Sequence, residues 1–301
     1  MLTKLGIVTN IWAACIEAGD RFEDLMEQFS KNGFKYMEIR DGDYLRQSEF
    51  GRFVCEIEAA MGRYSDDEWK QIGEGIEKAE VFDTIIKPED QELFKRFQSF
   101  SQRAADVEIS YAMAHPWLNL YKEPDGDNAT IIQAKKLAYL LCPEAARLRL
   151  VDPEFTGDVD MSTAVSNLKR YSDLLDSYPI ILAVENAKPP ATITFDVSEQ
   201  AGVKLAYDEA NTYGIDGIPV NPPETFWDAV KIDSLTSVHI KQKTADGVTP
   251  EICDGYVDFK AILGRLKTGG YDSDLLLENA PSNQPLEDAV NSREYLMKLE
   301  V

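Results

Sequence analysis

Eight short, mostly apolar segments recur along this chain of 301 residues, and a longer amphipathic segment follows each of them. Short apolar runs are typical of buried β-strands, and apolar residues at every third or fourth position are typical of helices. Strands that alternate with helices favour a parallel sheet, and eight such units favour closure of that sheet into a barrel. The segments predicted to be strands span residues 4–10, 34–40, 107–115, 146–152, 179–186, 203–211, 235–243 and 273–279.

The predicted fold is therefore α/β, a (β/α)8 TIM barrel formed as one domain over residues 1–301. An open, doubly wound sheet is the alternative, but no GxGxxG stretch occurs at a first βα turn to support it. Residues 45–105 lie between the second and third predicted strands and are too long for one crossover. They predict an elaborated helical region. A short helical turn is expected over residues 197–202, before the sixth strand.

The charge of the chain argues against some classes of partner. Lys and Arg number 31 against 53 Asp and Glu, which gives a net charge of −22 at neutral pH. Nucleic acid binding requires clustered basic residues, so this balance indicates a solvated, self-repelling surface instead. No run of about 18 apolar residues predicts a membrane span, and the first residues do not resemble a signal peptide. Four cysteines without a CxxC pair favour reduced thiols, so the expected location is cytoplasmic.

Four polar residues stand at or near the ends of the last four predicted strands: Glu185, Asp208, His239 and Glu278. The carboxyl ends of barrel strands meet at one rim, so we expect these side chains to lie close together. Three carboxylates and one imidazole form a hard, mostly oxygen ligand set, which suits Mn²⁺, Mg²⁺ or Co²⁺. Without a cation, the carboxylates would repel one another and raise one another's pKa. Taken singly, each residue is better explained as a helix cap or a solvated strand end, but four in succession favour a metal site.

The succession of these four residues resembles that of the xylose isomerase-like TIM barrels, the sugar phosphate isomerase/epimerase superfamily. The turn YDEAN, residues 207–211, is similar to the Asp-Pro-Ala-Asn turn of that group, with Glu209 in place of proline. The segment DGYVDFKAILGRLKTGGYDSDLLLE, residues 254–278, is similar to the C-terminal signature of the group. LGIVTNIW and GFKYMEIR fit its first two strands. The resemblance covers most of the chain and is specific from about residue 179 onward.

The resemblance implies one divalent metal, with Mn²⁺ as the first choice and Mg²⁺ or Co²⁺ as alternatives, held by Glu185, Asp208, His239 and Glu278. It also implies catalytic roles for Glu185 and Glu278, because in epimerases of this type the two glutamates exchange a proton with the carbon beside a carbonyl. The metal polarises the carbonyl and its neighbouring hydroxyl and stabilises an enediolate. A carboxylate on each face can then remove and return the proton.

Two features depart from the tagatose/psicose epimerases of this superfamily. Asn211 stands where those enzymes have a second histidine, three residues after the Asp, and the basic residues Lys241 and Lys243 follow the metal histidine. Substrate recognition is therefore expected to differ, with Asn211 and Lys241 as substrate-binding candidates. Lys241 is two residues beyond His239 and thus on the same strand face. The endonuclease IV branch is excluded, since its three-zinc site needs more histidines than the two present.

Four further residues are candidates on the same rim. His115, at the expected end of the third strand, could act as a general acid or base, and Trp117 could stack on a sugar ring or an aromatic aglycone. Both are equally well explained as packing in a loop at the barrel mouth. Arg40 and Arg149 either bind a substrate hydroxyl or carboxylate or neutralise the acidic rim, and charge compensation is the favoured interpretation.

Three functions follow from these residues. The first is a metal-dependent isomerase, epimerase or eliminating lyase that enolises a carbohydrate. The second, which the resemblance suggests, is the catalytic α subunit of a bacterial C-glycoside deglycosidase, which cleaves the carbon–carbon glycosidic bond of a 3-oxo-glycoside. The third is a metal- or sugar-binding subunit without turnover. The expected partners are a small carbohydrate or glycoside, and either further copies of the chain or a small β-rich subunit, with no nucleic acid and no membrane.

Overall fold

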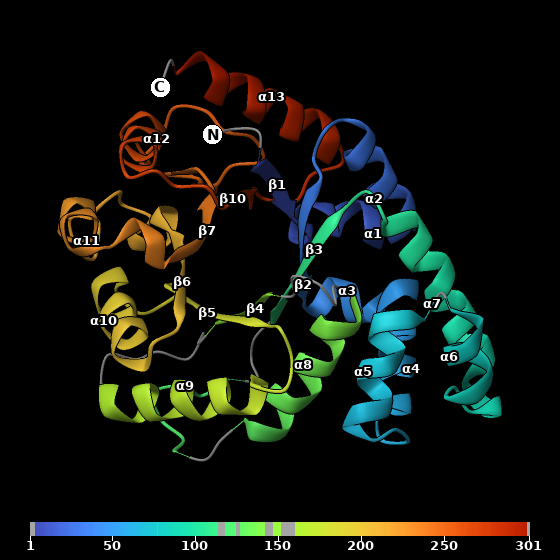
Figure 1. Cartoon of the computed structure of the whole chain (residues 1–301). Helices are drawn as coiled ribbons and strands as arrows, with labels where there is room; N and C mark the ends of the chain where they lie inside the picture. The colour runs from blue at the N-terminus through green and yellow to red at the C-terminus, as the bar shows by residue number, and fades with distance from the viewer. Residues whose placement is uncertain are drawn as a thin grey trace.

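The structure, a computed structural model, describes residues 4–76, 78–113, 118–124, 127–141, 147–151 and 160–299. Eight parallel strands close into a barrel in the order β1-β10-β7-β6-β5-β4-β3-β2, and helices surround it (Figure 1). All eight predicted strands are present, so the (β/α)8 fold is confirmed. The barrel strands are β1 (Leu5–Val8), β2 (Tyr36–Asp41), β3 (Glu108–Met113), β4 (Arg147–Leu150), β5 (Ile181–Glu185), β6 (Lys204–Asp208), β7 (Leu235–Ile240) and β10 (Asp274–Leu277).

The helices cover the barrel because each of them buries one face. In α2 the buried Phe22, Leu25, Met26 and Phe29 recur every three or four positions and join the hydrophobic core. Among the described residues, no helix combines the length and the apolar character needed to cross a lipid bilayer. The surrounding helices are α1 (Ala13–Glu17), α2 (Phe22–Lys31), α8 (Asn128–Leu141), α9 (Met161–Leu175), α10 (Ala191–Ala201), α11 (Pro223–Ala229), α12 (Phe259–Thr268) and α13 (Pro285–Lys298), with short 3-10 segments η2 (Thr9–Trp12), η4 (Glu209–Thr212) and η5 (Ile232–Ser234).

The predicted elaboration between β2 and β3 is present as a group of helices that projects beside α8 (Figure 1). Aromatic side chains attach this group to the barrel layer. Phe50 stacks on Phe22 of α2 with ring centroids 4.0 Å apart, and Phe100 lies 5.2 Å from Phe50. The group consists of α3 (Asp43–Gln47), α4 (Glu49–Met61), α5 (Asp66–Gly75), α6 (Ala79–Thr84), η3 (Pro88–Asp90) and α7 (Gln91–Ala104).

One predicted element is wrong in its extent. The short helical turn expected over residues 197–202 is the end of a longer helix, α10, which begins at Ala191. Its first turn contains β-branched Thr and Ile, which do not look helical in isolation. Burial at spacings of three and four along Ala191, Thr194, Phe195 and Ser198 stabilises the helix, so tertiary packing overrides local propensity.

Strand register places the ends of β5, β6, β7 and β10 at the same edge of the barrel. Asp208 pairs with His239 across β6 and β7, and His239 pairs with Leu276 of β10. The backbone N–H of Glu278 donates to Ile240 O at 3.1 Å, which extends this pairing one residue past β10. A two-stranded hairpin, β8 (Lys243–Thr244) and β9 (Gly247–Val248), follows β7 at the same edge.

Candidate metal centre

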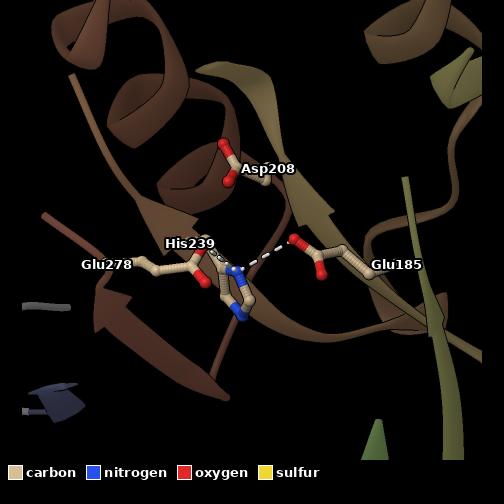
Figure 2. Close-up of side chains that lie close together, drawn as sticks. All are labelled: Glu185, Asp208, His239 and Glu278. Carbon is tan, nitrogen blue, oxygen red and sulfur yellow. Dashed lines mark hydrogen bonds and ion pairs between the residues drawn. The ribbon is translucent and has the colours of Figure 1, made fainter. Parts of the chain in front are cut away.

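Figure 2 shows the side chains of Glu185, Asp208, His239 and Glu278 converging at the carboxyl ends of their strands. Each offers one ligand atom, and these four atoms all lie within 4.8 Å of one another. The Nδ1 atom of His239 is 3.3 Å from Glu185 Oε1 and 3.2 Å from Glu278 Oε2. All four residues are buried, the most accessible being Glu278 at 6%. The structure therefore brings together the four residues that end successive strands.

This donor set fits a divalent cation. Three carboxylates and an imidazole nitrogen are ligands that hard and borderline divalent ions accept. Carboxylates buried together are costly unless a cation neutralises them. The ammonium of Lys241 supplies part of that charge, since its Nζ lies 2.5 Å from Asp208 Oδ2 and 2.9 Å from Glu278 Oε2. A bound ion would have to share these two carboxylates with Lys241.

Neighbouring cations set the protonation of the three carboxylates. Burial raises the pKa of Asp208 to about 6, although Lys241 opposes the rise. Burial acts in the same direction on Glu185, but the charges of Arg149 and His239 and a hydrogen bond with His239 together outweigh it and lower the pKa. Burial would also raise the pKa of Glu278, but Lys241, His239 and Arg149 together outweigh it and hold that pKa well below its usual range. Glu185 and Glu278 are thus charged at neutral pH.

The imidazole of His239 carries a proton when no metal is bound. Burial lowers its pKa and so does Arg149, but the charges of Glu278 and Glu185, together with hydrogen bonding to Glu185, outweigh both and raise it to about 9. Metal ligation requires a neutral imidazole nitrogen, so an ion must displace this proton when it binds.

Glu38 also belongs to the site, and the sequence analysis missed it. It stands in the middle of β2 with no exposed surface. Its Oε1 accepts a hydrogen bond from Arg149 Nε at 2.7 Å and lies 3.6 Å from His239 Nε2. Arg149 also donates to Glu185 Oε2, so one guanidinium neutralises two buried carboxylates. The sequence of β4, RLRL, could have indicated Glu38. Its two arginines lie on one face of the strand and are both buried, so they require acidic partners from nearby strands.

A cavity of about 180 Å³ opens onto the cluster. Asn211 Nδ2 donates to Glu185 Oε1 at 3.2 Å, and the guanidinium of Arg40 lies 3.8 Å from Glu278 Oε1. Asp208 and His239 are buried behind the lining. The charged and polar residues that line the cavity are Arg40, Arg149, Glu185, Lys188, Asn211, Lys241 and Glu278.

Two other sequence candidates have no structural test here. His115 and Trp117 both lie outside the described residues, so their roles stay predictions from sequence. Lys188, in contrast, is described by the structure but was not predicted from the sequence. It lines the cavity three residues beyond Glu185, but nothing in its local sequence, ENAKPP, distinguishes it from an ordinary surface lysine.

Glu209, which stands where the resembling turn has proline, is a buried carboxylate outside the cluster. Its Oε2 accepts a hydrogen bond from Trp227 Nε1 at 2.8 Å and another from Tyr207 Oη at 3.3 Å. Burial is the largest influence on its pKa and raises it to about 7, despite these two donors. Glu209 therefore takes up a proton more readily in the folded chain than in the unfolded chain.

Glu209→Gln is expected to stabilise the protein at pH 8 and to have little effect at pH 5. Because the folded pKa is raised, the unfolded chain ionises first as pH rises, and stability is lost between about pH 4.5 and 7. The neutral amide avoids that loss, with a gain on the order of 2–3 kcal/mol, and keeps an acceptor for Trp227. Urea unfolding of both proteins at the two pH values measures the difference. Equal gains at both pH values would contradict the ionisation argument.

The comparisons agree with this architecture. No family model and no curated protein matches the sequence. Solved structures do match the fold. A xylose isomerase domain containing protein from Salmonella typhimurium is similar over 99% of this chain and 98% of its own, with a TM-score of 0.62 at 13% identity. D-allulose 3-epimerase from Methylomonas sp. is similar over 98% and 97%, with a TM-score of 0.60 at 15% identity.

A third solved structure is a xylose isomerase-like TIM barrel protein from Mycobacterium smegmatis in complex with magnesium. It is similar over 92% of this chain and 87% of its own, with a TM-score of 0.58 at 15% identity. The closed eight-stranded barrel and these similarities together define the class of fold. The chain has the fold of the xylose isomerase-like TIM barrels. At such low identities the likeness extends to the fold, and function has to be argued from the site.

Proposed function

We propose that the protein is a divalent-metal-dependent enzyme that transfers a proton at the carbon next to a carbonyl group of a carbohydrate, as an isomerase or epimerase. The observation that carries this proposal is the buried cluster of Glu185, Asp208, His239 and Glu278 beside a cavity at the carboxyl end of the barrel. Active sites of this fold lie at that end. The similarity in fold to a D-allulose 3-epimerase supports the reaction class.

The four clustered side chains would hold the ion, with Mn²⁺ as the first choice and Mg²⁺ or Co²⁺ next, because the ligand set is mostly oxygen. A divalent ion bound there supplies positive charge that stabilises the oxyanion formed when a proton is removed beside a carbonyl. Asp208 and His239 act only as ligands in this proposal, since they do not line the cavity.

Glu185 and Glu278 move the proton. Both line the cavity, and in Figure 2 they approach His239 from opposite sides. Arg149 and Asn211 hold Glu185 by hydrogen bonds, and Lys241 contacts Glu278, so each carboxylate is fixed in position. Both are charged at neutral pH and each can accept a proton. One carboxylate removes the proton from one face of a carbon and the other returns a proton to the opposite face, which inverts that carbon.

A solvent exchange screen tests the proposal. Keto-sugars and 3-oxo-glycosides are incubated in D2O with the chelated protein and with the Mn²⁺-loaded protein, and deuterium at carbon is followed by NMR. We expect incorporation into at least one substrate, only with metal. The absence of exchange across the panel, in protein that holds one equivalent of metal, would contradict the proposal and favour a binding subunit.

The 3-oxo-glycosides are included because cleavage of a carbon–carbon glycosidic bond is the alternative reaction. That alternative begins with the same proton abstraction. It is suggested by the departures from the epimerase pattern, together with His115 and Trp117, which lie outside the described residues. Release of an aglycone from a 3-oxo-C-glycoside would favour it. Deuterium incorporation without release favours the isomerase or epimerase.

The affinity for the metal is expected to fall as pH falls. Because the pKa of His239 is about 9 in the metal-free protein, binding below pH 9 requires release of its proton. Apparent affinity then drops about tenfold per pH unit, or about 100-fold from pH 8.5 to 6.5, and Asp208 adds a second proton below about pH 6. Titration calorimetry with Mn²⁺ in buffers of different ionisation enthalpy measures both the affinity and the proton release. A pH-independent affinity would show that His239 is not a ligand.

A further inference from the structure

The cavity and the whole chain have opposite charge. The chain carries a net charge of −22, yet four cations line the cavity against two carboxylates, Glu185 and Glu278. The overall acidity of the chain does not explain why cations are concentrated at this cavity. We therefore look for an explanation in what the cavity binds. The four cations are Arg40, Arg149, Lys188 and Lys241.

These cations differ in what they already contact. Arg149 is buried and Lys241 is partly buried, and each contacts two buried carboxylates. The side chain of Arg40 is 44% exposed, and its one ion pair within the described part of the chain is with Glu278, at 3.8 Å. Lys188 is exposed at the mouth of the cavity and makes no ion pair with any residue that the structure describes. Its ammonium is therefore available to a ligand.

A further ammonium, that of Lys243, belongs to β8, directly after β7. Lys243 is partly buried and donates a hydrogen bond from Nζ to Tyr213 O at 2.6 Å. Burial lowers the pKa of Lys243, and the charges of Lys241 and Lys188 lower it further, while the charge of Asp208 raises it. An anion bound in the cavity beside Lys188 and Lys241 would offset part of this positive charge.

The charges at the cavity and the cluster leave an excess of positive charge when a divalent ion is bound. The four lining cations are matched by four carboxylates, namely Glu38, Glu185, Asp208 and Glu278. A bound divalent ion and a neutral imidazole then leave two positive charges in excess, and the ammonium of Lys243 adds to this excess. A substrate carboxylate offsets part of it. Proton transfer does not change the total, because the glutamate that takes the proton becomes neutral as the oxyanion forms.

We infer that the substrate is a sugar acid, whose carboxylate binds Lys188 at the mouth of the cavity while its carbonyl faces the metal cluster. This inference rests on the proposed function and narrows it from carbohydrates in general to anionic ones. A cavity of about 180 Å³ is smaller than the range of about 300–1,000 Å³ typical of sites for drug-sized ligands, which suits a single monosaccharide. Lys188 is then a substrate-binding residue, and Arg40 adds to the positive potential.

The test compares sugars that differ only in the carboxylate. Binding of D-glucuronate against D-glucose, and of D-galacturonate against D-galactose, is measured by calorimetry with the Mn²⁺-loaded protein. We expect the acids to bind at least about tenfold more tightly, and Lys188→Gln to remove most of that preference, since a hydrogen bond to a charged group is lost. Lys260→Gln, which removes the same charge from an exposed position on α12, is the matched control and should keep the preference.

Several results would overturn the inference. Each acid and its neutral partner could bind equally, or neither could bind. The preference for the acids could survive Lys188→Gln. Glucose 6-phosphate could bind tenfold more tightly than the uronates, which would assign the anion as a phosphate.

The outcomes separate this inference from the proposed function. Exchange of deuterium only into neutral sugars would leave the function standing and remove the sugar acid. Binding of uronates that depends on Lys188, without exchange into any sugar, would do the reverse.

Discussion

Replacing Asp208 with Asn is expected to abolish stoichiometric binding of a divalent ion while the barrel stays folded. Asp208 is fully buried and offers one of the four candidate ligand atoms. The amide keeps the shape and can still accept the hydrogen bond from the Ala210 N–H, at 2.9 Å, that caps η4. It removes a negative charge from the ligand set, so the loss of affinity should exceed the roughly 10–100-fold cost of losing an outer partner of a metal ligand.

Calorimetric titration with Mn²⁺ and metal analysis after dialysis measure this effect. Glu209→Gln is the matched control, because it neutralises the adjacent buried carboxylate, which contacts Trp227 and lies outside the cluster. We expect the control to bind one equivalent with an affinity close to that of the parent. Parent-like affinity in Asp208→Asn would remove Asp208 from the ligand set.

Replacing Arg149 with Met is expected to destabilise the metal-free protein by about 3–5 kcal/mol, the usual cost of breaking a buried ion pair. Arg149 is 2% exposed and neutralises Glu38 and Glu185, which are also buried. Met has a similar length and fills the space, so the loss comes from two carboxylates left without their main cation. Urea unfolding in the presence of a chelator measures the free energy of unfolding.

Two further variants separate this charge effect from packing. Arg265→Met removes an arginine whose pair with Asp228, at 3.6 Å, is exposed, and should change stability by less than about 1 kcal/mol. Adding Glu38→Gln to Arg149→Met should recover part of the loss, because one stranded charge disappears. No recovery in the double variant would show that packing dominates at Arg149.

The repeating pattern of the sequence was enough to predict the barrel. Each strand is an apolar run bounded by polar or glycine-rich turns, and all eight appear within a few residues of the predicted ends. Glu185, Asp208, His239 and Glu278 could be grouped because they end successive strands, and parallel strand ends meet at one edge. The predicted topology of the barrel was therefore enough to predict that these four residues, far apart in sequence, lie close together in space.

Other parts of the site could not be read from the sequence. Glu38 lies within the barrel on β2, and only the closed sheet brings it near Arg149 of β4 and His239 of β7. Lys188 stands in a loop, where a lysine is ordinary, and its meaning depends on the cavity that it lines. The extent of α10 was misjudged because burial, rather than helix propensity, stabilises its first turn.

Crystals grown with Mn²⁺ and measured at the manganese absorption edge test the central claim most directly. The account predicts one anomalous peak within coordination distance of Glu185, Asp208, His239 and Glu278, with Lys241 moved or sharing the two carboxylates that it contacts. A manganese-free cluster in which the ammonium of Lys241 alone lies between Asp208 and Glu278 would contradict it. The four side chains would then form a buried ion-pair network instead of a metal site.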